Sequence, residues 1–339
     1  MAYDTLIKVL HVGVANRGTW PLTACSAETG FVPWALCDTS REALEAALRV
    51  TGLSDSVAFT DYDEALETSG AECVIICTPT KYHVPMAIRA IDAGLPVLVE
   101  KGMAPDWESA TRLVTAARDS GVPVAVSQNY RYGSTARTVK RAVSDPACEY
   151  YTGAVHHVLY WQNRVRPNPR TLDYPHGSVW DMSCHHFDNV TYWFGALETM
   201  TAASWRAAWS AYSYDHNTSA HIVLRNGVAV SYGHTHDAAR ISEEIQVHGD
   251  RGALFFRDGV FEFSERPKVN FGVSPVVPVS PVATEDERDL LRDFRTWLDG
   301  GPEPGISARA NLETMACCEM MVRSLESGRP IRRAELGVG

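Results

Sequence analysis

The sequence has few cysteines, and none of them stands in a pattern typical of metal binding or redox exchange. Eight cysteines are spread over 339 residues, and no two form a CxxC pair. Zinc knuckles and thiol–disulfide motifs need such closely spaced pairs. Cys73 and Cys77 lie in the apolar run AECVIIC, where a thiol acts as a small hydrophobic side chain. We therefore expect buried, reduced cysteines and no bound metal.

Positive charge and long apolar runs are also scarce. Lys and Arg number 31 against 41 Asp and Glu, which gives a formal net charge of -10. Non-specific nucleic-acid binding needs a cationic surface, so we expect no nucleic-acid partner. No uncharged apolar stretch approaches the roughly 20 residues of a membrane span, and the start MAYDTLIKVLHVGV lacks a signal-peptide pattern. These absences predict a soluble, cytoplasmic protein with no membrane partner.

The first third of the chain alternates strand-like and helix-like segments. Apolar runs such as 7–12, 31–37 and 72–77 are typical of buried strands, and helical spacing follows between them. Strands that alternate with helices predict right-handed βαβ crossovers and a parallel sheet. The sequence therefore predicts an α/β fold that begins with a doubly wound, dinucleotide-binding Rossmann domain over residues 1–128.

After this point strands follow one another with short turns. Runs such as 199–207, 220–224 and 228–236 indicate an antiparallel sheet. Two helical segments at about 285–298 and 308–327 close the chain. We predict an α+β domain over residues 129–339 with a large open, mainly antiparallel sheet for substrate binding and oligomerisation, and leave open that its terminal helices pack back on the first domain.

A glycine-containing turn follows the first predicted strand. Gly13 to Gly18 matches GxGxxG except that Ala15 replaces the middle glycine. A turn of this kind at the start of a helix can present backbone N–H groups to a pyrophosphate. The alternative is that the turn has only a structural role. The second strand ends in Asp38, which can accept hydrogen bonds from a ribose diol. Its charge favours NAD over NADP, although Ser40 and Arg41 leave NADP open.

A second motif stands in the predicted helix 178–194. Asp181, His185 and Asp188 are spaced i, i+4 and i+7, so they share one face of an α-helix. Asp181 can orient His185 and stabilise its protonated form, an arrangement suited to general acid–base catalysis. The alternative is a structural pair at the start of a buried helix.

Taken together, the motifs resemble the Gfo/Idh/MocA family of glucose–fructose oxidoreductase, inositol dehydrogenase and relatives. Their order along the chain carries the resemblance: Gly13 to Gly18, Thr78-Pro79 with His83, Glu100-Lys101, Asn129-Tyr130-Arg131, and Asp181 with His185 and Asp188. The chain departs from the family at Gly102, where Glu-Lys-Pro is usual, and at His176-Gly177-Ser178, where the family has a glycine-rich helix entry. The resemblance implies a nicotinamide cofactor and a sugar, cyclic polyol or glycoside as substrate.

The resemblance also implies a set of site residues. Lys101, Asp181 and His185 form the expected catalytic set, in which a secondary hydroxyl loses a proton while a hydride passes to nicotinamide. Which of Lys101 and His185 is the base stays open. The expected cofactor-binding residues are Gly13, Ala15, Asn16, Arg17, Gly18, Asp38, Ser40, Arg41, Thr78, Pro79, His83, Glu100, Lys101 and Gln128. The expected substrate-binding residues are Lys101, Tyr130, Arg131, His157, Trp161, Arg164, Asp181 and His185.

Other interpretations remain open at this stage. A redox-neutral enzyme would recycle NAD while it modifies or cleaves a glycoside, with Tyr232, His186 and His236 as extra acid–base groups. A non-catalytic NAD-binding regulator would use the same fold. His234 and His236 share a strand face, as two zinc ligands could. No third and fourth ligand stand at the spacing of a zinc site, so we expect both histidines to be ordinary strand residues without a metal. A large apolar sheet face exposed to water favours association with another surface. We therefore also expect a homodimer or homotetramer that forms through the second domain's sheet.

Overall fold

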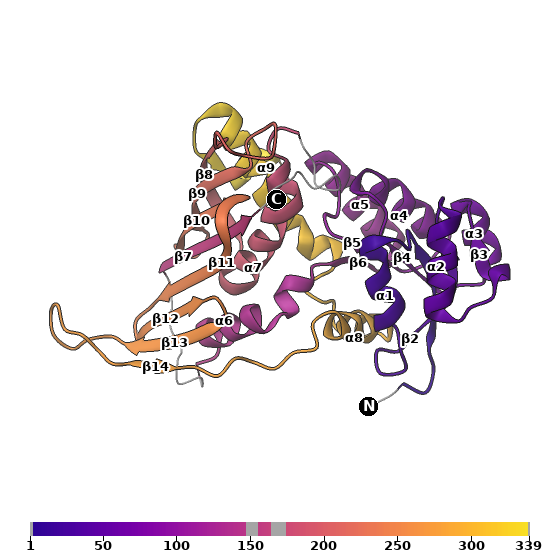
Figure 1. Ribbon diagram of the computed structural model, residues 1–339, viewed down its shortest axis with the longest axis horizontal. Coiled ribbons are helices and arrows are strands. Elements are labelled where there is room, and N and C mark those ends of the chain that lie inside the picture. The colour runs from indigo at the N-terminus through magenta and orange to yellow at the C-terminus, as the bar shows by residue number, and fades with distance from the viewer. Residues whose placement is uncertain (1–2, 147–154, 164–173, 338–339) are drawn as a thin grey trace. The chain divides into compact units, whose positions relative to one another are not determined.

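The computed structural model describes residues 3–146, 155–163 and 174–337, with only the backbone described at 155–157 and 163. The chain forms two compact units (Figure 1). One comprises residues 1–132 and 285–312, and the other comprises residues 133–284 and 313–339. The predicted boundary at residue 128 lies close to the end of the first of these segments.

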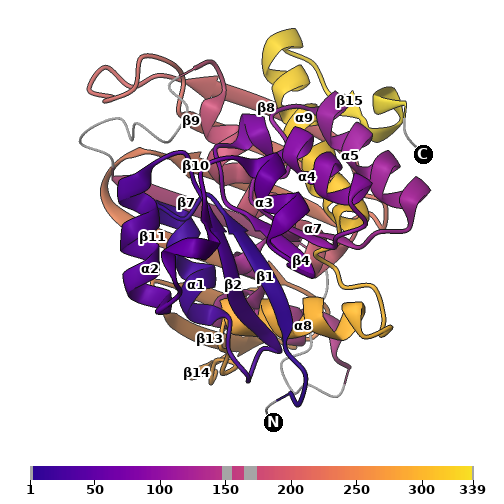
Figure 2. The same cartoon turned by 90° about the vertical axis from the view of Figure 1, so that its right-hand side faces the viewer.

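The first unit contains a six-stranded parallel sheet. Its strand order is β3-β2-β1-β4-β5-β6, which is the order of a doubly wound dinucleotide-binding fold. β1 and β2 lie side by side near the viewer in Figure 2. The predicted Rossmann fold is confirmed. The strands are β1 (Ile7–Val12), β2 (Phe31–Cys37), β3 (Ala58–Phe59), β4 (Cys73–Ile76), β5 (Val97–Glu100) and β6 (Val124–Ser127).

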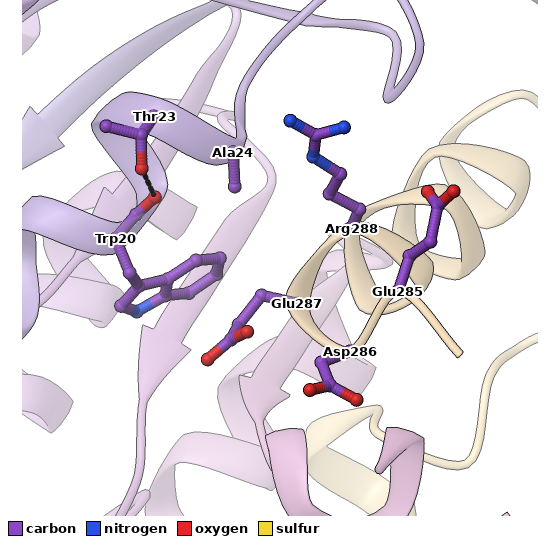
Figure 3. A pocket seen from close by; sticks show the side chains of 7 residues that line it. All are labelled: Trp20, Thr23, Ala24, Glu285, Asp286, Glu287 and Arg288. Carbon is purple, nitrogen blue, oxygen red and sulfur yellow. Dashed lines mark hydrogen bonds between the residues drawn. The ribbon is translucent and has the colours of Figure 1, made fainter. Parts of the chain in front are cut away.

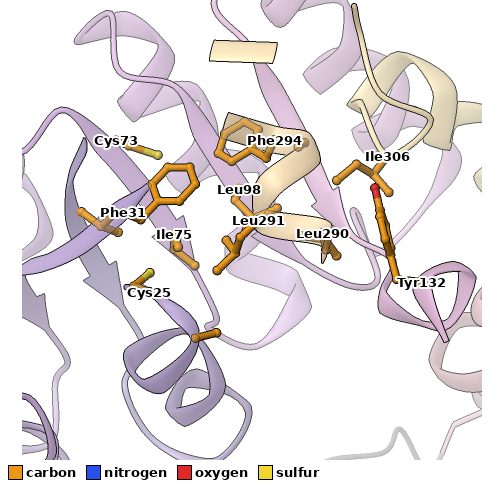
Figure 4. Packing of buried hydrophobic residues seen from close by; sticks show 13 residues of the cluster. Cys25, Phe31, Cys73, Ile75, Leu98, Tyr132, Leu290, Leu291, Phe294 and Ile306 are labelled. Atoms are coloured by element: carbon orange, nitrogen blue, oxygen red, sulfur yellow. The ribbon is translucent and has the colours of Figure 1, made fainter. Parts of the chain in front are cut away.

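Helices connect these strands and supply the apolar core. They are α1 (Thr19–Ala24), α2 (Arg41–Thr51), α3 (Tyr62–Thr68), α4 (His83–Asp92), α5 (Trp107–Ser120) and the later α8 (Glu287–Leu298). In α8, Leu290 and Leu291 are buried in one cluster with strand residues such as Ile75 (Figure 4). The rings of Phe31 and Phe294 stack there with centroids 5.9 Å apart. α8 therefore belongs to the core of the Rossmann unit.

The second unit contains a nine-stranded sheet in the order β14-β13-β12-β11-β7-β10-β9-β8-β15. Neighbouring strands pair antiparallel except β10 and β7, which are parallel, so the predicted mainly antiparallel sheet is confirmed. The strands are β7 (Val155–Asn163), β8 (Leu197–Trp205), β9 (Asn217–Leu224), β10 (Ala229–Thr235), β11 (Asp237–His248), β12 (Gly252–Arg257), β13 (Val260–Glu265), β14 (Val276–Pro278) and β15 (Ile331–Arg332). Its helices include α6 (Ser134–Ser144), α7 (Cys184–Phe194) and most of α9 (Ala308–Ser327).

Two parts of this unit differ from the prediction. The helix expected over 178–194 begins with a π-helical turn, Val179–Ser183, and becomes α-helical only at Cys184. The strands β13 and β14 were not predicted, and residues 266–275 between them extend beyond the sheet in Figure 1. Among the described residues, no helix has the length and apolar character to cross a membrane.

Candidate functional site

The turn after β1 requires glycine at two positions. Gly13 has φ +77°, and a Cβ there would lie 2.9 Å from the backbone of Cys77. At Gly18 a Cβ would lie 1.7 Å from the Gly13 carbonyl oxygen. Asn16 adopts a left-handed φ of 56°, which Asn tolerates better than most residues. The loop is therefore a tight backbone cradle at the entrance to α1, the geometry that suits a pyrophosphate.

Asp38 fixes this cradle from the neighbouring strand. Its Oδ2 accepts a hydrogen bond of 2.9 Å from the N–H of Val14, and Oδ1 accepts one of 2.9 Å from the N–H of Ser40. A carboxylate has about four lone-pair sites, so acceptor capacity is left for a ribose diol. Ser40 is the N-cap of α2 and accepts from the N–H of Ala43, while Arg41 is exposed beside it.

Glu100, at the end of β5, is the centre of a buried hydrogen-bond network. It is 4% exposed. Its carboxylate accepts from Arg17 Nε at 3.2 Å, from Trp20 Nε1 at 3.2 Å and from Ser127 Oγ at 2.7 Å. Arg17 also lies 3.9 Å from a Glu287 carboxylate oxygen. The network ties the glycine loop to β5 and β6, directly beside Lys101.

His83 joins the loop at Thr78 to the segment that follows Lys101, the predicted catalytic lysine. Its Nδ1 lies 2.8 Å from the Gly102 carbonyl oxygen and its Nε2 lies 2.7 Å from the Thr78 carbonyl oxygen. Burial lowers the pKa of His83, although the two carbonyls and Glu100 act in the opposite direction. Both ring nitrogens thus face backbone atoms. His83 holds the Thr78-Pro79 turn and the segment after Lys101 together.

Gln128 carries a buried polar atom that no other described residue contacts by a hydrogen bond. The residue follows β6 and is 1% exposed. Its Oε1 is buried and has no hydrogen-bond partner within the described residues. An unsatisfied buried acceptor costs about 1–3 kcal/mol, so a ligand that donates to it gains binding energy. With the glycine cradle and Asp38, this acceptor completes a set that fits a dinucleotide.

A pocket of about 560 Å³ opens in the same unit, lined in part by Trp20 of the Glu100 network. It lies between α1 and the start of α8, and the Trp20 ring forms one wall (Figure 3). Three acids, Glu285, Asp286 and Glu287, line the other side, with Arg288 beside them. Carboxylates repel a pyrophosphate, so this pocket is not the place for the cofactor phosphates.

In the second unit, Asp181 and His185 stand on either side of a helix junction. Asp181 lies in the π-helical turn and is half-buried, whereas His185 lies in α7 and is 4% exposed. The prediction of one continuous α-helix through both residues is wrong, because a π-turn precedes the α-helix and spaces side chains differently. Asp188 is buried and accepts from Thr314 Oγ1 at 3.2 Å, which gives it a role in packing α9.

The remaining predicted substrate residues lie in both units. Tyr130 and Arg131 belong to a 3₁₀ turn after β6, Asn129–Tyr132, where Tyr130 is 39% exposed. Trp161 is 40% exposed on β7. Its neighbour Tyr160 stacks on His186 of α7, so Trp161 points to the opposite face of the sheet. Only the backbone of His157 is described, and Arg164 lies outside the described residues.

A buried group of aromatic and imidazole rings lies under α7. His186 stacks on Tyr160, and His234 and His236 follow along β10 and just beyond it. Nδ1 of His236 lies 3.3 Å from Nδ1 of His216. No cluster of three or more metal-ligating side chains occurs in the part of the chain that the structure describes. The sequence pointed to His186, His234 and His236, but gave no signal for Tyr160 or His216, which contribute from other strands.

Both parts of the chain match known protein families. Residues 7–128 match an oxidoreductase family with an NAD-binding Rossmann fold, and residues 173–332 match the C-terminal alpha/beta domain of that family. A D-apiose dehydrogenase of Paraburkholderia graminis is 25% identical, with 89% of this chain and 83% of that protein covered. An NADP⁺-dependent scyllo-inositol 2-dehydrogenase of Bacillus subtilis is 26% identical, with 61% of this chain and 57% of that protein covered.

A solved structure has the same fold. The putative NADPH-dependent oxidoreductase of Desulfitobacterium hafniense superposes with a TM-score of 0.87 at 16% sequence identity. The superposition covers 98% of this chain and 99% of that one. At this identity the likeness extends to both units of the fold and says nothing of the substrate.

Proposed function

Because the chain belongs to the Gfo/Idh/MocA oxidoreductase family, with an NAD-binding Rossmann unit, we propose that it oxidises a secondary hydroxyl of a sugar or cyclic polyol. The observation that carries the proposal is the placement of Lys101. It directly follows β5, between the Glu100 network and the segment that His83 holds. Ligands of open α/β sheets bind outside the carboxyl ends of the strands, which is where this lysine lies.

The chain's own residues fit the cofactor in three ways. The N–H groups of the glycine loop would hold the pyrophosphate, Asp38 would accept from a ribose diol, and Gln128 Oε1 would accept one further hydrogen bond. Glu100 holds Arg17 in place, so we assign both to shaping the cradle. His83, Thr78 and Pro79 support it through backbone contacts. Bound NAD would supply the hydride acceptor, and Arg41 leaves NADP as a second candidate.

Two side chains act on the substrate hydroxyl in this proposal, and a third acts on one of them. Lys101 donates a hydrogen bond to the reacting oxygen and stabilises the negative charge that develops there. His185 takes up the hydroxyl proton as general base. Asp181 fixes the orientation of His185 and stabilises the imidazolium that forms. The D-apiose dehydrogenase similarity supports a carbohydrate substrate.

Two further features belong to the proposal. The chain assembles into a homodimer or homotetramer through the exposed face of its second sheet, where small side chains alternate with Trp205. It works in the cytoplasm, in keeping with its seven free cysteines among the described residues.

Spectrophotometry with added NAD tests the function. Polyols, aldoses and glycosides are each mixed with NAD and wild-type protein, and the absorbance of reduced nicotinamide is followed. Lys101→Ala is expected to abolish the signal while the dissociation constant for NAD stays within about twofold, and Lys268→Ala, an exposed lysine far along the chain, keeps wild-type turnover.

Three results would contradict the dehydrogenase. Turnover of Lys101→Ala at a wild-type rate would remove the lysine from the chemistry. Consumption of a glycoside without accumulation of reduced nicotinamide would favour the redox-neutral alternative. Binding of NAD without consumption of any compound would favour a regulator.

A further inference from the structure

The helix that carries Asp181 and His185 is tied to the sheet by one tyrosine hydroxyl. The Tyr232 hydroxyl donates to Ser183 Oγ at 2.8 Å and lies 2.8 Å from Nδ1 of His186. Tyr232 belongs to β10, Ser183 ends the π-helical turn, and His186 lies in the first turn of α7. All three side chains are buried. A single oxygen therefore joins the strand, the π-turn and the α-helix.

The direction of one hydrogen bond fixes the direction of the other. We assign the single hydroxyl hydrogen of Tyr232 to Ser183 Oγ. The contact with His186 must then be a hydrogen bond that the imidazole Nδ1–H donates to the tyrosine oxygen. Burial raises the pKa of Tyr232 well above its ordinary value, so the hydroxyl keeps its proton. His186 is thereby held in the Nδ1–H tautomer.

The π-turn makes this connection important for the predicted catalytic pair. π-helical turns are rare and occur mostly as single turns within helices, often at functional sites. Asp181 lies within the turn and His185 lies in the α-helix that follows. Rewinding the turn to α-helical geometry would therefore rotate Asp181 relative to His185. Ser183 is the last residue of the turn, so a hydrogen bond to its side chain opposes that rewinding.

The surrounding rings pack without any help from the hydroxyl. Tyr160 stacks on His186 with an angle of 3° between the ring planes. The ring centroids of Phe187 and Tyr232 are 5.1 Å apart. Replacing Tyr232 by Phe keeps these ring contacts and deletes only the oxygen. The substitution therefore separates the hydrogen-bond chain from the packing of the core.

We propose that Tyr232 is a positioning residue, whose hydroxyl acts through Ser183 and His186 to set the direction of Asp181 relative to His185. Neither Tyr232 nor Ser183 contacts the substrate in this assignment. The kinetic consequence rests on the proposed function, whereas the tautomer of His186 does not. The two parts are therefore tested by separate measurements on the full-length protein.

The kinetic test uses the compound from the NAD panel that wild-type protein turns over fastest. Tyr232→Phe and Ser183→Ala are each expected to lower kcat about tenfold to a hundredfold, because a misplacement of about 1 Å can cost a hundredfold. KM and the dissociation constant for NAD stay within about twofold. The kcat of the double variant falls no further than that of either single variant, because both substitutions break the same chain of hydrogen bonds. Ser183→Thr keeps the hydroxyl and restores at least half of wild-type kcat.

Unchanged kcat in Tyr232→Phe, or losses that multiply in the double variant, would overturn the assignment. Should Tyr232→Phe fail to fold, the Ser183→Ala and Ser183→Thr pair decides alone. If His185→Ala and Lys101→Ala both keep wild-type turnover, the proposed function fails instead.

The substrate-free test is nuclear magnetic resonance of the histidine ring nitrogens, with His186 assigned by the loss of its signals in His186→Gln. Wild-type protein is expected to show His186 protonated at Nδ1, and Tyr232→Phe is expected to lose that fixed tautomer. A wild-type His186 protonated at Nε2 alone would overturn the hydrogen-bond chain whatever the kinetics show.

Discussion

The Asp38 carboxylate accepts a hydrogen bond of 2.9 Å from the backbone N–H of Val14, in the glycine loop. Asp38 directly follows β2 and Val14 follows β1, so the contact ties the loop to the end of the neighbouring strand. The second carboxylate oxygen accepts from Ser40. The acid proposed to select the cofactor thus also supports the loop proposed to hold the pyrophosphate, and its substitution should have two separable effects.

Asp38→Asn is expected to weaken NAD binding and to favour NADP. Asparagine keeps one carbonyl acceptor but removes the negative charge that repels a 2′-phosphate, and Arg41 is exposed nearby to receive it. We expect the ratio of NADP affinity to NAD affinity to rise at least about tenfold, equal to about 1.4 kcal/mol. Isothermal titration calorimetry with each oxidised cofactor measures both affinities.

A matched control is Asp61→Asn, which changes a helix-capping aspartate. Asp61 accepts from the N–H of Glu64 at 2.9 Å at the start of α3. Because asparagine and aspartate are about equally good N-caps, it should leave stability nearly unchanged and leave the cofactor ratio unchanged. Equal ratios in Asp38→Asn and wild type would show that Asp38 serves only the loop.

Glu100→Gln is expected to destabilise the Rossmann unit and weaken NAD binding. The wild-type carboxylate accepts from Arg17, Trp20 and Ser127 while almost fully buried. Glutamine has one acceptor oxygen and turns an N–H₂ group toward these donors, so at least one hydrogen bond is lost. We expect the free energy of unfolding to fall by about 1–3 kcal/mol. Urea denaturation measures it, with the exposed Glu108→Gln on α5 as control.

The sequence predicted those features that depend on short-range patterns. The parallel sheet follows from apolar runs that alternate with helices, and the tight turn after β1 follows from Gly13 and Gly18. The Glu100 network was not predicted, since its partners come from three segments without any common spacing. The residues Arg17 and Glu100 were expected to bind the cofactor directly, and whether they also do so stays a prediction.

The π-turn was missed for a different physical reason. Asp181 and His185 are spaced i and i+4, which fits an α-helix equally well by sequence. Contacts from β10, through Tyr232, are made by residues far away in the chain. The strands β13 and β14 were missed although Phe261 and Phe263 alternate with polar residues, because the stretch is short and a long connection follows it. Tertiary pairing decides such segments more than local preference.

Glu243 is expected to make the protein less stable as the pH rises. Burial, with a smaller contribution from Asp258, raises the pKa of Glu243 from 4.5 to about 7. The folded protein therefore holds a proton on Glu243 that the unfolded chain releases above pH 4.5. Stability from this group is complete below that pH and is lost between the two pKa values, because the unfolded state binds fewer protons there.

Glu243→Gln should remove this loss. Each pKa unit corresponds to about 1.4 kcal/mol. We therefore expect the free energy of unfolding of the variant, measured relative to that of wild type, to be higher at pH 8 than at pH 5 by on the order of 2–3 kcal/mol. Thermal or urea unfolding at the two pH values measures the gain. Glu262→Gln, an exposed carboxylate on β13, should change neither value. A parallel pH dependence in Glu243→Gln and wild type would contradict the assignment.

The proposed oligomer predicts a surface variant that separates the subunits. Ala203 on β8 and Ser219 on β9 are paired across the sheet, and both are exposed. Such small side chains leave a flat surface that a second sheet can approach closely. An arginine introduced at its centre would be buried against the same arginine of the second subunit, which destabilises the interface. Ser219→Arg should therefore yield monomers at micromolar concentration by light scattering, while Val50→Arg, an exposed apolar position on α2, keeps the wild-type mass. A monomeric wild-type protein would remove this sheet face from the interface, and an oligomer that survives Ser219→Arg would place the contact elsewhere on the chain.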